Sequence, residues 1–370
     1  MAQVEIVQVR ERRALRRFIE FPHQLYREDP NWVPPLRISQ RDLLDARKHP
    51  FHRHAEIQCF LALEGQEVVG RIAAILDRDQ FEPDHAGFFG FFESVDSPAV
   101  SGALFEAARA WLARREARVI RGPVNPSTNY ECGLLVAGFG TSPCVMMTYN
   151  PPYYPALVER AGGRKAMDLY AYYCTEEMVA GRKAERVAGR ALASNGVAIR
   201  GLRVEDFECE VEAVWKLYNS AWSRNWGFAP MREDEFRHLA ADLKHILVPE
   251  LALIGEVQGR PVGFALAVPD INQALRHADG RLFPLGLFKI LYHRRRIRRL
   301  RVMALGVVED YRTAGVAAGF YARLFQEGIR LGFREGEFSW VLEDNILMIR
   351  SLETLGARRY KTYRIYELTP

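Results

Sequence analysis

The chain of 370 residues is 48% hydrophobic and 26% charged, and its formal net charge is +5 at pH 7. This length is sufficient for two domains, the composition excludes a low-complexity chain, and the modest charge does not by itself indicate a nucleic-acid-binding protein. No apolar run approaches the ~20 residues that cross a bilayer, and the first residues lack the pattern of a signal peptide, so we expect a soluble protein or one that at most rests on a membrane.

Strands and helices alternate along the first half of the chain. The pattern of apolar residues predicts strands at residues 4–9, 56–63, 68–76, 87–92, 118–122 and 165–174. Helices are predicted at residues 10–28, 38–47, 99–115 and 151–161. Asn-Pro, Gly-Phe-Gly and Ser-Pro turns interrupt residues 123–149, so this stretch is expected to be irregular. The charged segment 176–196 is expected to be a helix that connects two domains.

In the second half, a strand, a glycine-containing turn and a helix follow one another directly. Val302–Val308 is a continuous apolar run, as expected of a central strand that is buried on both faces. The turn Arg312-Thr-Ala-Gly-Val-Ala317 comes next, and from Val316 onward apolar residues recur at helical spacing. The other predicted elements are strands at residues 251–257, 261–268 and 338–342 and a helix at residues 346–356.

The turn before this helix is suited to a phosphate group. The N–H groups of a first helical turn lack partners, the helix dipole is positive there, and glycine lets a ligand approach the backbone closely. Arg312 adds a bidentate donor for a pyrophosphate. We therefore expect a phosphate-containing ligand at Gly315.

The pattern Arg312-x-x-Gly315-x-Ala317 resembles the Q/R-x-x-G-x-G/A acyl-CoA loop of the GNAT (Gcn5-related N-acetyltransferase) superfamily. The helix from Ile346 to Gly356, which Asn345 precedes, is similar to the superfamily's "N…lGF" segment. The resemblance covers residues 197–370 and implies a transferase with acyl-CoA as co-substrate, whose pantetheine lies between two splayed strands. The residues that it assigns to acyl-CoA are Leu305, Val307, Arg312, Thr313, Ala314, Gly315, Val316, Ala317 and Asn345.

The first half of the chain repeats the order of the second half. Segment 60–70 parallels segment 253–263, and Gly162 corresponds to Gly356, so the matching glycines are 193 or 194 residues apart. An internal duplication accounts for this spacing. We therefore predict an α/β (α+β) fold of tandem GNAT-like lobes, each a mixed, mostly antiparallel central sheet flanked by helices. The first lobe is expected at residues 1–175 and the second at residues 197–370.

The two predicted lobes differ at the loop. The counterpart of the Gly315 loop, Glu93-Ser-Val-Asp-Ser-Pro-Ala99, has no glycine and carries two carboxylates, which would repel a pyrophosphate. We predict that the first lobe has lost CoA binding. Residues 123–149 are then available to cover the other lobe or to line an acceptor pocket, and a surface excursion without such a role is the alternative.

Acyl transfer to an amine needs a base for the ammonium proton and an acid for the departing thiolate. Asp270 and Glu343 are the candidates for the base, and a turn or helix cap is the alternative for each. In the superfamily, a tyrosine four residues before the final glycine of the Asn helix frequently supplies the acid, but Leu352 occupies this position here. Tyr363 is the assigned replacement. The other tyrosines considered are Tyr366, Tyr149 and Tyr153, and the thiolate can also leave unassisted.

An aromatic and amide cluster lies where acceptor sites of the superfamily usually lie, after the first long helix of the second lobe. The residues assigned to the substrate are Asn219, Trp222, Asn225, Trp226, Asn272 and Tyr149. Core packing is the alternative for the tryptophans, and a cap of the following helix is the alternative for Asn345.

The second half contains an unusual insert at residues 270–300. Leu282–Tyr292 is strongly apolar, and seven Lys and Arg side chains fall between Lys289 and Arg301. This composition is typical of a segment that lies at a membrane surface. The basic run is also suited to an acyl carrier protein or to the 3′-phosphate of CoA, and a packed amphipathic helix is the remaining alternative. No nucleic acid is expected, because no aromatic residues interleave with the arginines.

The whole chain resembles two-lobed bacterial GNAT-like proteins and, more weakly, the bacterial ceramide synthases. The resemblance implies an N-acyltransferase that uses acetyl-CoA or long-chain acyl-CoA and acts on a lipid-like amine such as a sphingoid base, in the cytoplasm or peripherally on the inner membrane. The alternatives are an N-acetyltransferase of a small soluble amine and a non-catalytic acyl-CoA- or lipid-binding protein. No metal is expected, because the cysteines lack ligand spacing. They are Cys59, Cys132, Cys144, Cys174 and Cys209.

Overall fold

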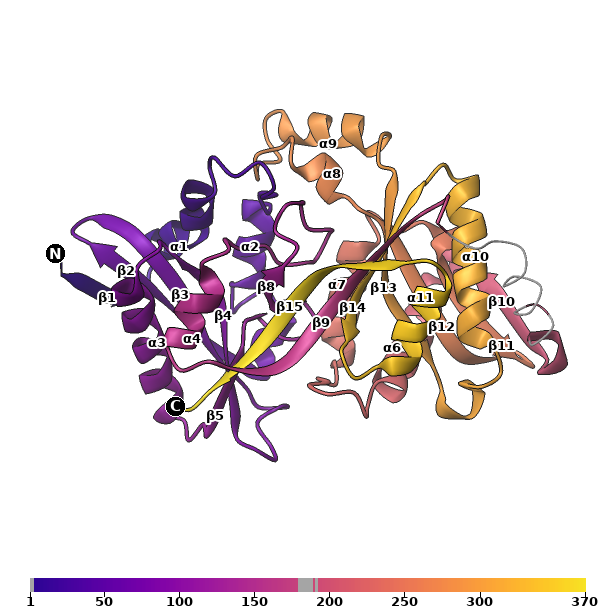
Figure 1. The fold of residues 1–370 in the computed structure, drawn as a ribbon, viewed down its shortest axis with the longest axis horizontal. Coiled ribbons are helices and arrows are strands. Elements are labelled where there is room, and N and C mark those ends of the chain that lie inside the picture. The colour runs from indigo at the N-terminus through magenta and orange to yellow at the C-terminus, as the bar shows by residue number, and fades with distance from the viewer. Residues whose placement is uncertain (1–2, 179–188, 190–191) are drawn as a thin grey trace. The chain divides into compact units, whose positions relative to one another are not determined.

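The computed structural model describes residues 3–178, 189 and 192–370, so most of the connector expected at residues 176–196 lies outside the described residues. The chain divides into two compact units (Figure 1). Lobe 1 comprises residues 1–169, 274–293 and 361–370, and lobe 2 comprises residues 170–273 and 294–360. Among the described residues, no helix combines the length and the hydropathy that a bilayer crossing needs.

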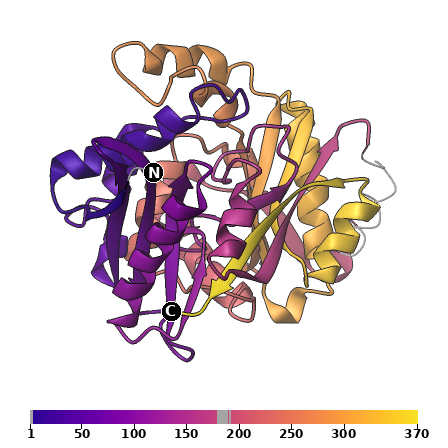
Figure 2. The same cartoon turned by 60° about the vertical axis from the view of Figure 1, so that its left-hand side comes forward.

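Lobe 1 is built around a sheet with the strand order β1-β2-β3-β4-β5-β15 (Figures 1 and 2). Neighbouring strands are antiparallel except β4 and β5, which are parallel. The strands are β1 (Val4–Gln8), β2 (Ala55–Glu64), β3 (Glu67–Asp77), β4 (Ala86–Ser94), β5 (Val119–Gly122), β8 (Leu134–Ala137), which pairs with β15, and β15 (Arg358–Leu368). The helices are α1 (Arg12–Leu25), α2 (Arg37–Leu43), α3 (Pro98–Ala113), α4 (Tyr154–Arg160) and α9 (Gly286–Arg294), whose last residue belongs to lobe 2.

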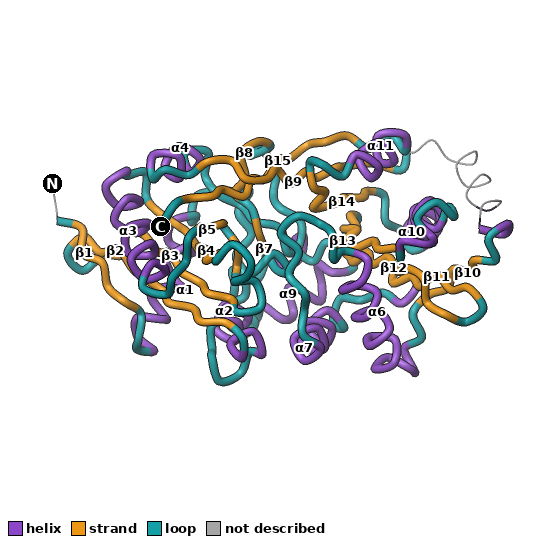
Figure 3. The backbone as a smooth tube through the Cα atoms, turned by 90° about the horizontal axis from the view of Figure 1, so that it is seen from below, coloured by secondary structure: helices purple, strands orange, loops and turns teal. Residues whose placement is uncertain are grey.

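Lobe 2 contains the strands in the order β9-β14-β13-β12-β11-β10, with β13 and β14 parallel and β10 to β13 successively antiparallel. They are β9 (Arg164–Thr175), β10 (Val197–Gly201), β11 (Ala252–Val257), β12 (Arg260–Pro269), β13 (Arg299–Val307) and β14 (Glu335–Leu342). The helices are α6 (Phe207–Ala221), α7 (Glu233–Leu243), α10 (Val316–Arg330) and α11 (Ile346–Thr354), and the short α8 (Asn272–Leu275) straddles the boundary between the lobes. In Figure 3, α10 and α11 cover one face of this sheet, and α6 and α7 cover the other. The expected fold class is confirmed.

Helix α10 is held on its sheet by the apolar face that the sequence predicts. Val316, Phe320 and Leu324 are buried in one cluster with Ala265 of β12 and Val302 of β13. Burial of a large aliphatic or aromatic side chain contributes roughly 1.5–3 kcal/mol. This packing fixes the start of α10 a short loop after the end of β13.

The observed lobes differ from the expected ranges 1–175 and 197–370 in two ways. Strands β9 and β15 each carry residues of both lobes, so residues 170–175 belong to lobe 2 and residues 361–370 to lobe 1. Residues 274–293 of the insert also group with lobe 1. Within this segment, the Gly280 carbonyl accepts a hydrogen bond from the Arg37 N–H of lobe 1 (3.1 Å).

Each lobe contains a pair of parallel strands that separate. In lobe 2, β13 and β14 pair only from Arg299↔Glu335 to Val302↔Phe338, although β13 continues to Val307. In lobe 1, β4 and β5 pair only over residues 86–88 and 119–121, although β4 continues to Ser94. We call the opening between β13 and β14 fork 2 and the opening between β4 and β5 fork 1.

Candidate functional site

The glycine loop of lobe 2 has the geometry that the sequence predicts. A short 3₁₀ turn (Glu309–Tyr311) follows β13, and α10 begins after Gly315, whose φ of +77° lies in the left-handed region that favours glycine. Gly315 offers no side chain to cap α10, and the first hydrogen bond of the helix runs from the Gly319 N–H to the Gly315 carbonyl (2.9 Å). The amide groups of the first turn are therefore disposed to hold an anion.

Fork 2 exposes one edge of β13 next to this loop. The pairing of β13 with β14 ends at Val302↔Phe338. On its other side, β12 pairs Ala267 with Val302 and Leu266 with Ala304, so that Met303 forms a bulge. Residues 303–305 are only half-buried. An extended ligand that carries amide groups can add to such an edge in the manner of a strand.

Several residues assigned to acyl-CoA shape the loop with their side chains. Val307, Ala314 and Val316 are buried in the core cluster beneath it, while Leu305 and Ala317 are half-buried against the same cluster. A ligand at this loop would therefore meet the backbone of these residues. Thr313 is exposed and presents its side chain at the surface.

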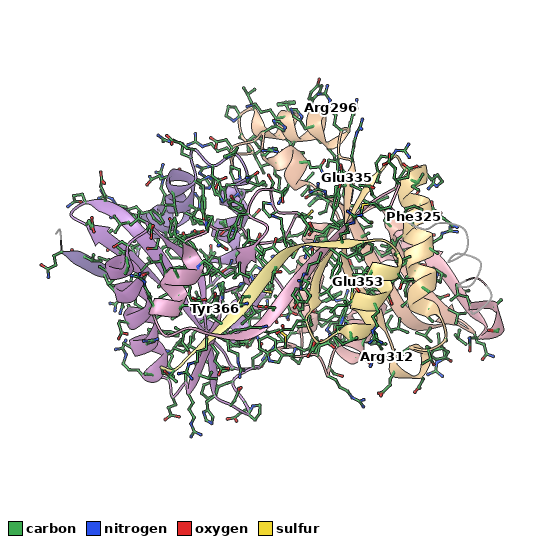
Figure 4. The ribbon with its side chains drawn as sticks, in the orientation of Figure 1. Arg296, Arg312, Phe325, Glu335, Glu353 and Tyr366 are labelled. Atoms are coloured by element: carbon green, nitrogen blue, oxygen red, sulfur yellow. The ribbon has the colours of Figure 1, made fainter. Side chains whose placement is uncertain are left out.

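Arg312 does not extend from the loop in this structure. Its Nη2 donates to the carbonyl of Ala221 (3.0 Å) at the end of α6, and its Nε donates to the carbonyl of Val307 (3.4 Å). A cation is favourable at the C-terminal end of a helix. The side chain, which Figure 4 labels, thus links α6 to the end of β13.

Asn345 caps the helix that follows it. Its side chain accepts a hydrogen bond from the Met348 N–H (3.2 Å) at the start of α11. In the structure Asn345 is thus a helix cap, which the sequence analysis allowed as the alternative to a contact with acyl-CoA.

The residues assigned to the substrate separate into different surroundings. Trp222 packs edge-on against Phe264 of β12, with ring centroids 5.3 Å apart, and a Cβ built on Gly306 would lie 3.6 Å from its ring. Asn225 and Trp226 lie in the turn after α6 and are half-buried. Trp222 therefore lines the α6 face of β13, next to the loop.

Other substrate candidates serve local structure. The Asn219 side chain both accepts from the Met231 N–H and donates to the Met231 carbonyl, each at 3.0 Å, so it ties α6 to the segment before α7. Asn272 is the first residue of α8. Tyr149 belongs to lobe 1, where its hydroxyl donates to Asp29 (2.8 Å).

The predicted acid and base candidates are also placed by the structure. Asp270 is 2% exposed, its N–H donates to the Arg299 carbonyl (2.9 Å), and its carboxylate accepts from Gln273 (3.3 Å), as in the turn that was its alternative. Glu343 is half-buried between β14 and α11. Tyr363 is fully buried in lobe 1, so the structure gives it the position of a core residue.

A buried polar network at the start of fork 2 was not predicted. Arg301 and Glu337 are paired residues of β13 and β14, and the exposed fractions of Arg301, Glu337 and Ser339 are 4%, 0% and 3%. Arg301 donates from Nε to Ser339 Oγ (2.9 Å) and from Nη2 to the Ser339 carbonyl (3.1 Å). The Ser339 hydroxyl donates to one oxygen of Glu337, and the Tyr360 hydroxyl donates to the other. We call these four residues the fork network.

Fork 1 is filled by the chain itself. The Phe91 N–H of β4 donates to the side chain of Asn125 (2.6 Å), and a Cβ on Gly90 would lie 1.7 Å from the Val124 carbonyl oxygen. The start of α3 is also occupied, because the Ser97 hydroxyl accepts from the Val100 N–H (3.4 Å). Lobe 1 thus lacks the two openings that lobe 2 has at the equivalent places.

One of the two acidic residues in the lobe 1 counterpart of the glycine loop, Glu93, points inward, whereas Asp96 is exposed. Glu93 accepts hydrogen bonds from the hydroxyls of Tyr26 (2.6 Å) and Tyr154 (2.7 Å). Burial raises the pKa of Glu93, against the opposing effect of the nearby Arg71 charge. Glu93 therefore takes part in the core of lobe 1.

Three side chains of a kind that can bind metals meet in lobe 1. The ligand atoms of His54, Asp77 and Asp79 lie within 4.8 Å of one another. His54 Nδ1 lies 2.9 Å from Asp77, which also accepts from the Asp79 N–H (3.0 Å) and the Gln80 side chain (2.6 Å). These hydrogen bonds account for the arrangement as a turn after β3.

Comparison with known proteins places this geometry in context. No protein-family model matches the chain. The chain is 37% identical over 375 aligned positions to a protein of Caulobacter vibrioides named bacterial ceramide synthase, covering 99% of this chain and 97% of that one. It is 36% identical to the Escherichia coli protein YghO, and the alignment covers 95% of this chain and 92% of YghO. A solved tandem GNAT protein from the clavulanic acid biosynthesis pathway superposes with a TM-score of 0.59 at 11% identity, covering 99% and 98% of the two chains.

Proposed function

The chain belongs to the family of bacterial ceramide synthase and has the fold of tandem GNAT proteins, and on this premise we propose that it is an acyl-CoA-dependent N-acyltransferase. One observation carries the proposal: in lobe 2, the helix start at Gly315 without a side-chain cap follows the open strand edge of fork 2 after a short 3₁₀ turn. The first feature suits a diphosphate and the second suits an extended chain of amides. Acyl-CoA carries both groups in this order.

The order of these features sets where the acyl group would lie. With the pyrophosphate at the amide groups after Gly315, the pantetheine arm would run back along Leu305 and Met303. The thioester would then approach the start of fork 2, beside the fork network. Glu343 lies at the other end of β14, which makes the pair Tyr360–Glu337 the better candidate for proton transfer.

In the proposed reaction an amine nitrogen attacks the thioester carbon. The C–N bond forms, the C–S bond breaks, the nitrogen releases its proton to water, and the departing thiolate takes a proton from an acid that regains it from water. We assign the protonation of the thiolate to the Tyr360 hydroxyl, which takes the role of the tyrosine that Leu352 replaces. Leu352 is fully buried in the apolar cluster beneath α11 and offers no proton.

For the acceptor we propose a lipid-like amine such as a sphingoid base. The name of the Caulobacter relative supports this choice. The aromatic surface on the α6 face also supports an apolar acceptor, because Trp222 packs with Tyr218 (4.6 Å between ring centroids) and with Phe264 beside β13. We place one such site in each chain, since fork 1 is filled.

Release of free thiol tests the activity. Palmitoyl-CoA with sphinganine is expected to give free CoA and an N-acylated product of the corresponding mass. Release from acetyl-CoA with small soluble amines alone would favour an acetyltransferase. Binding of acyl-CoA without release for any amine would favour a non-catalytic binding protein.

A second experiment tests the location of the site. Gly315→Glu places a carboxylate at the start of α10 and should weaken binding of palmitoyl-CoA by ~tenfold or more. Gly332→Glu is the matched control at the other end of this helix, because Gly332 shares a positive φ (+94°) with Gly315, and a Cβ at Gly332 would meet no atom within 4 Å. Equal affinity of both variants and the unchanged protein would overturn the proposed site.

A further inference from the structure

The insert exposes an unusual concentration of large apolar side chains. Six of them lie within ten residues, and all belong to lobe 1. Their exposed fractions are 72% for Phe283, 63% for Leu285, 38% for Leu287, 68% for Phe288, 50% for Leu291 and 59% for Tyr292. Elsewhere in the described chain, four large apolar residues are similarly exposed. An exposed patch of this kind marks an interaction site.

The geometry of α9 gathers these side chains on one side. Leu287, Phe288, Leu291 and Tyr292 follow the spacing of neighbours on a helical surface, and Phe283 and Leu285 lie in the turn that leads into the helix. Because these side chains are exposed, α9 is not the packed amphipathic helix that the sequence left as an alternative.

The insert is nevertheless firmly attached to lobe 1. Besides the backbone bond to Gly280, the Arg37 guanidinium donates to the Asp279 carbonyl (2.6 Å) and forms an ion pair with Glu20 (2.8 Å). Arg276 donates to the Pro30 carbonyl (2.7 Å). The rings of His277 and His293 stack with centroids 3.6 Å apart, which ties α9 to the segment before it. The apolar patch is therefore presented on an ordered support.

The charge of the segment from Arg281 to Arg301 is of one sign. From Arg281 to Arg301 the sequence contains no acidic residue. The basic side chains of this stretch that are exposed are Arg281, Lys289, Arg294, Arg295, Arg296 and Arg298, of which Figure 4 labels Arg296. Apolar residues flanked by exposed arginines are complementary to a lipid surface, which has an apolar acyl region beneath anionic headgroups.

We propose that residues 281–298 form a membrane-binding element that takes an anionic lipid surface as its partner. The apolar side chains of α9 enter the boundary between headgroups and acyl chains, and the basic residues contact lipid phosphates. A second copy of the chain is disfavoured as the occupant, because a two-fold interface would bring two basic clusters together. The proposal does not depend on catalysis, so its failure would leave the proposed reaction untouched.

Flotation of the full chain with vesicles tests the element. Binding is expected with vesicles of phosphatidylcholine and phosphatidylglycerol, and it should weaken as salt is added. Phe288→Gln combined with Leu291→Gln, and separately Arg294→Gln, Arg295→Gln and Arg296→Gln combined, should each reduce binding by ~tenfold or more.

Matched controls on other exposed sites keep the result specific. Ile346→Gln combined with Leu347→Gln changes two exposed apolar residues, and Arg10→Gln, Arg12→Gln and Arg13→Gln combined change three exposed arginines. Both controls should bind like the unchanged protein. Absence of vesicle binding, equal losses in the controls, capture of an acyl carrier protein in place of vesicles, or self-association that the α9 variants abolish would each overturn the proposal.

Discussion

The Tyr360 hydroxyl donates a hydrogen bond to the carboxylate of Glu337, and this pair lies where β13 and β14 begin to separate. Glu337 is fully buried, and the second oxygen of its carboxylate accepts from Ser339, which also contacts Arg301. A buried carboxylate with this many partners is costly to disturb. Because Glu337 lies at the start of fork 2, the Tyr360 hydroxyl that binds it is a testable candidate for the acid in catalysis.

The first prediction concerns the Tyr360 hydroxyl. If this group protonates the departing thiolate, Tyr360→Phe should lower kcat by about 10²-fold or more and leave the KM for acyl-CoA nearly unchanged. Tyr173→Phe is the control, because its ring lies 5.8 Å from that of Tyr360. Steady-state kinetics with both variants measure this effect. An unchanged kcat of Tyr360→Phe would show that the Tyr360 hydroxyl is not the acid that protonates the thiolate.

The second prediction concerns the stability of the fork network. Glu337→Gln removes the negative charge from a buried network that contains Arg301, so the free energy of unfolding should fall by ~3–5 kcal/mol. Ser339→Ala removes one hydroxyl and should cost less, ~1–3 kcal/mol. Urea denaturation followed by circular dichroism measures both values. A loss in Glu337→Gln no larger than that in Ser339→Ala would show that the charge matters little.

The third prediction concerns the number of binding sites. Native mass spectrometry should find one acyl-CoA per chain, because the Asn125 side chain occupies the edge of β4 in fork 1. Asn125→Ala leaves the Phe91 N–H without this acceptor and should lower the free energy of unfolding by ~1–3 kcal/mol. Two bound molecules in the unchanged protein would contradict the assignment of the site to lobe 2 alone.

The fourth prediction separates two roles of Arg312. Arg312→Ala removes the donor to the Ala221 and Val307 carbonyls and should lower the free energy of unfolding by ~1 kcal/mol. Arg224→Ala is the control, because its ion pair with Glu309 (2.7 Å) joins the turn after α6 to the 3₁₀ turn after β13 at an exposed position and should contribute ~0.5 kcal/mol or less. A loss of acyl-CoA affinity in Arg312→Ala with unchanged stability would indicate that Arg312 serves the ligand instead.

The fifth prediction concerns pH. Burial, with the nearby Arg37 charge as the second cause, lowers the pKa of His23 to about 4. The unfolded chain has the ordinary histidine pKa of about 6.5 and therefore binds a proton first as pH falls. As pH falls from about 6.5 to 4, the free energy of unfolding should decrease by up to ~3 kcal/mol. Above about pH 6.5 His23 is neutral in both the folded and the unfolded chain, so it causes no loss there.

Urea denaturation across this pH range measures the effect. His23→Phe keeps a ring next to Trp32 and cannot be protonated, so its stability should fall less steeply than that of the unchanged protein. The exposed His245→Phe should retain the original slope. Equal slopes for His23→Phe and the unchanged protein would assign the pH dependence to other groups.

Local patterns in the sequence predicted much of lobe 2. The apolar run before the turn became β13, and the helical spacing after Gly315 became α10. These features could be predicted because each depends on residues that are close in the sequence. The fork was implied by the family resemblance, and the pairing of β13 with β14 then showed where it begins.

Other features depend on contacts that sequence patterns do not reveal. Arg37 and Gly280 meet although 243 positions separate them, so the attachment of the insert to lobe 1 was not predicted. Glu337 lies just before the strand that the sequence predicted at residues 338–342, whereas β14 begins at Glu335, and this concealed the fork network. Asn345 was ambiguous because the amide that binds a ligand also caps a helix.

The sharing of β9 and β15 has a consequence for how this protein can be made. Lobe 1 is synthesised first, yet residues 361–368 of its sheet leave the ribosome only after all of lobe 2. A cut in the segment that joins the two halves would therefore yield two fragments, each without part of its own sheet. Neither fragment is then expected to fold by itself.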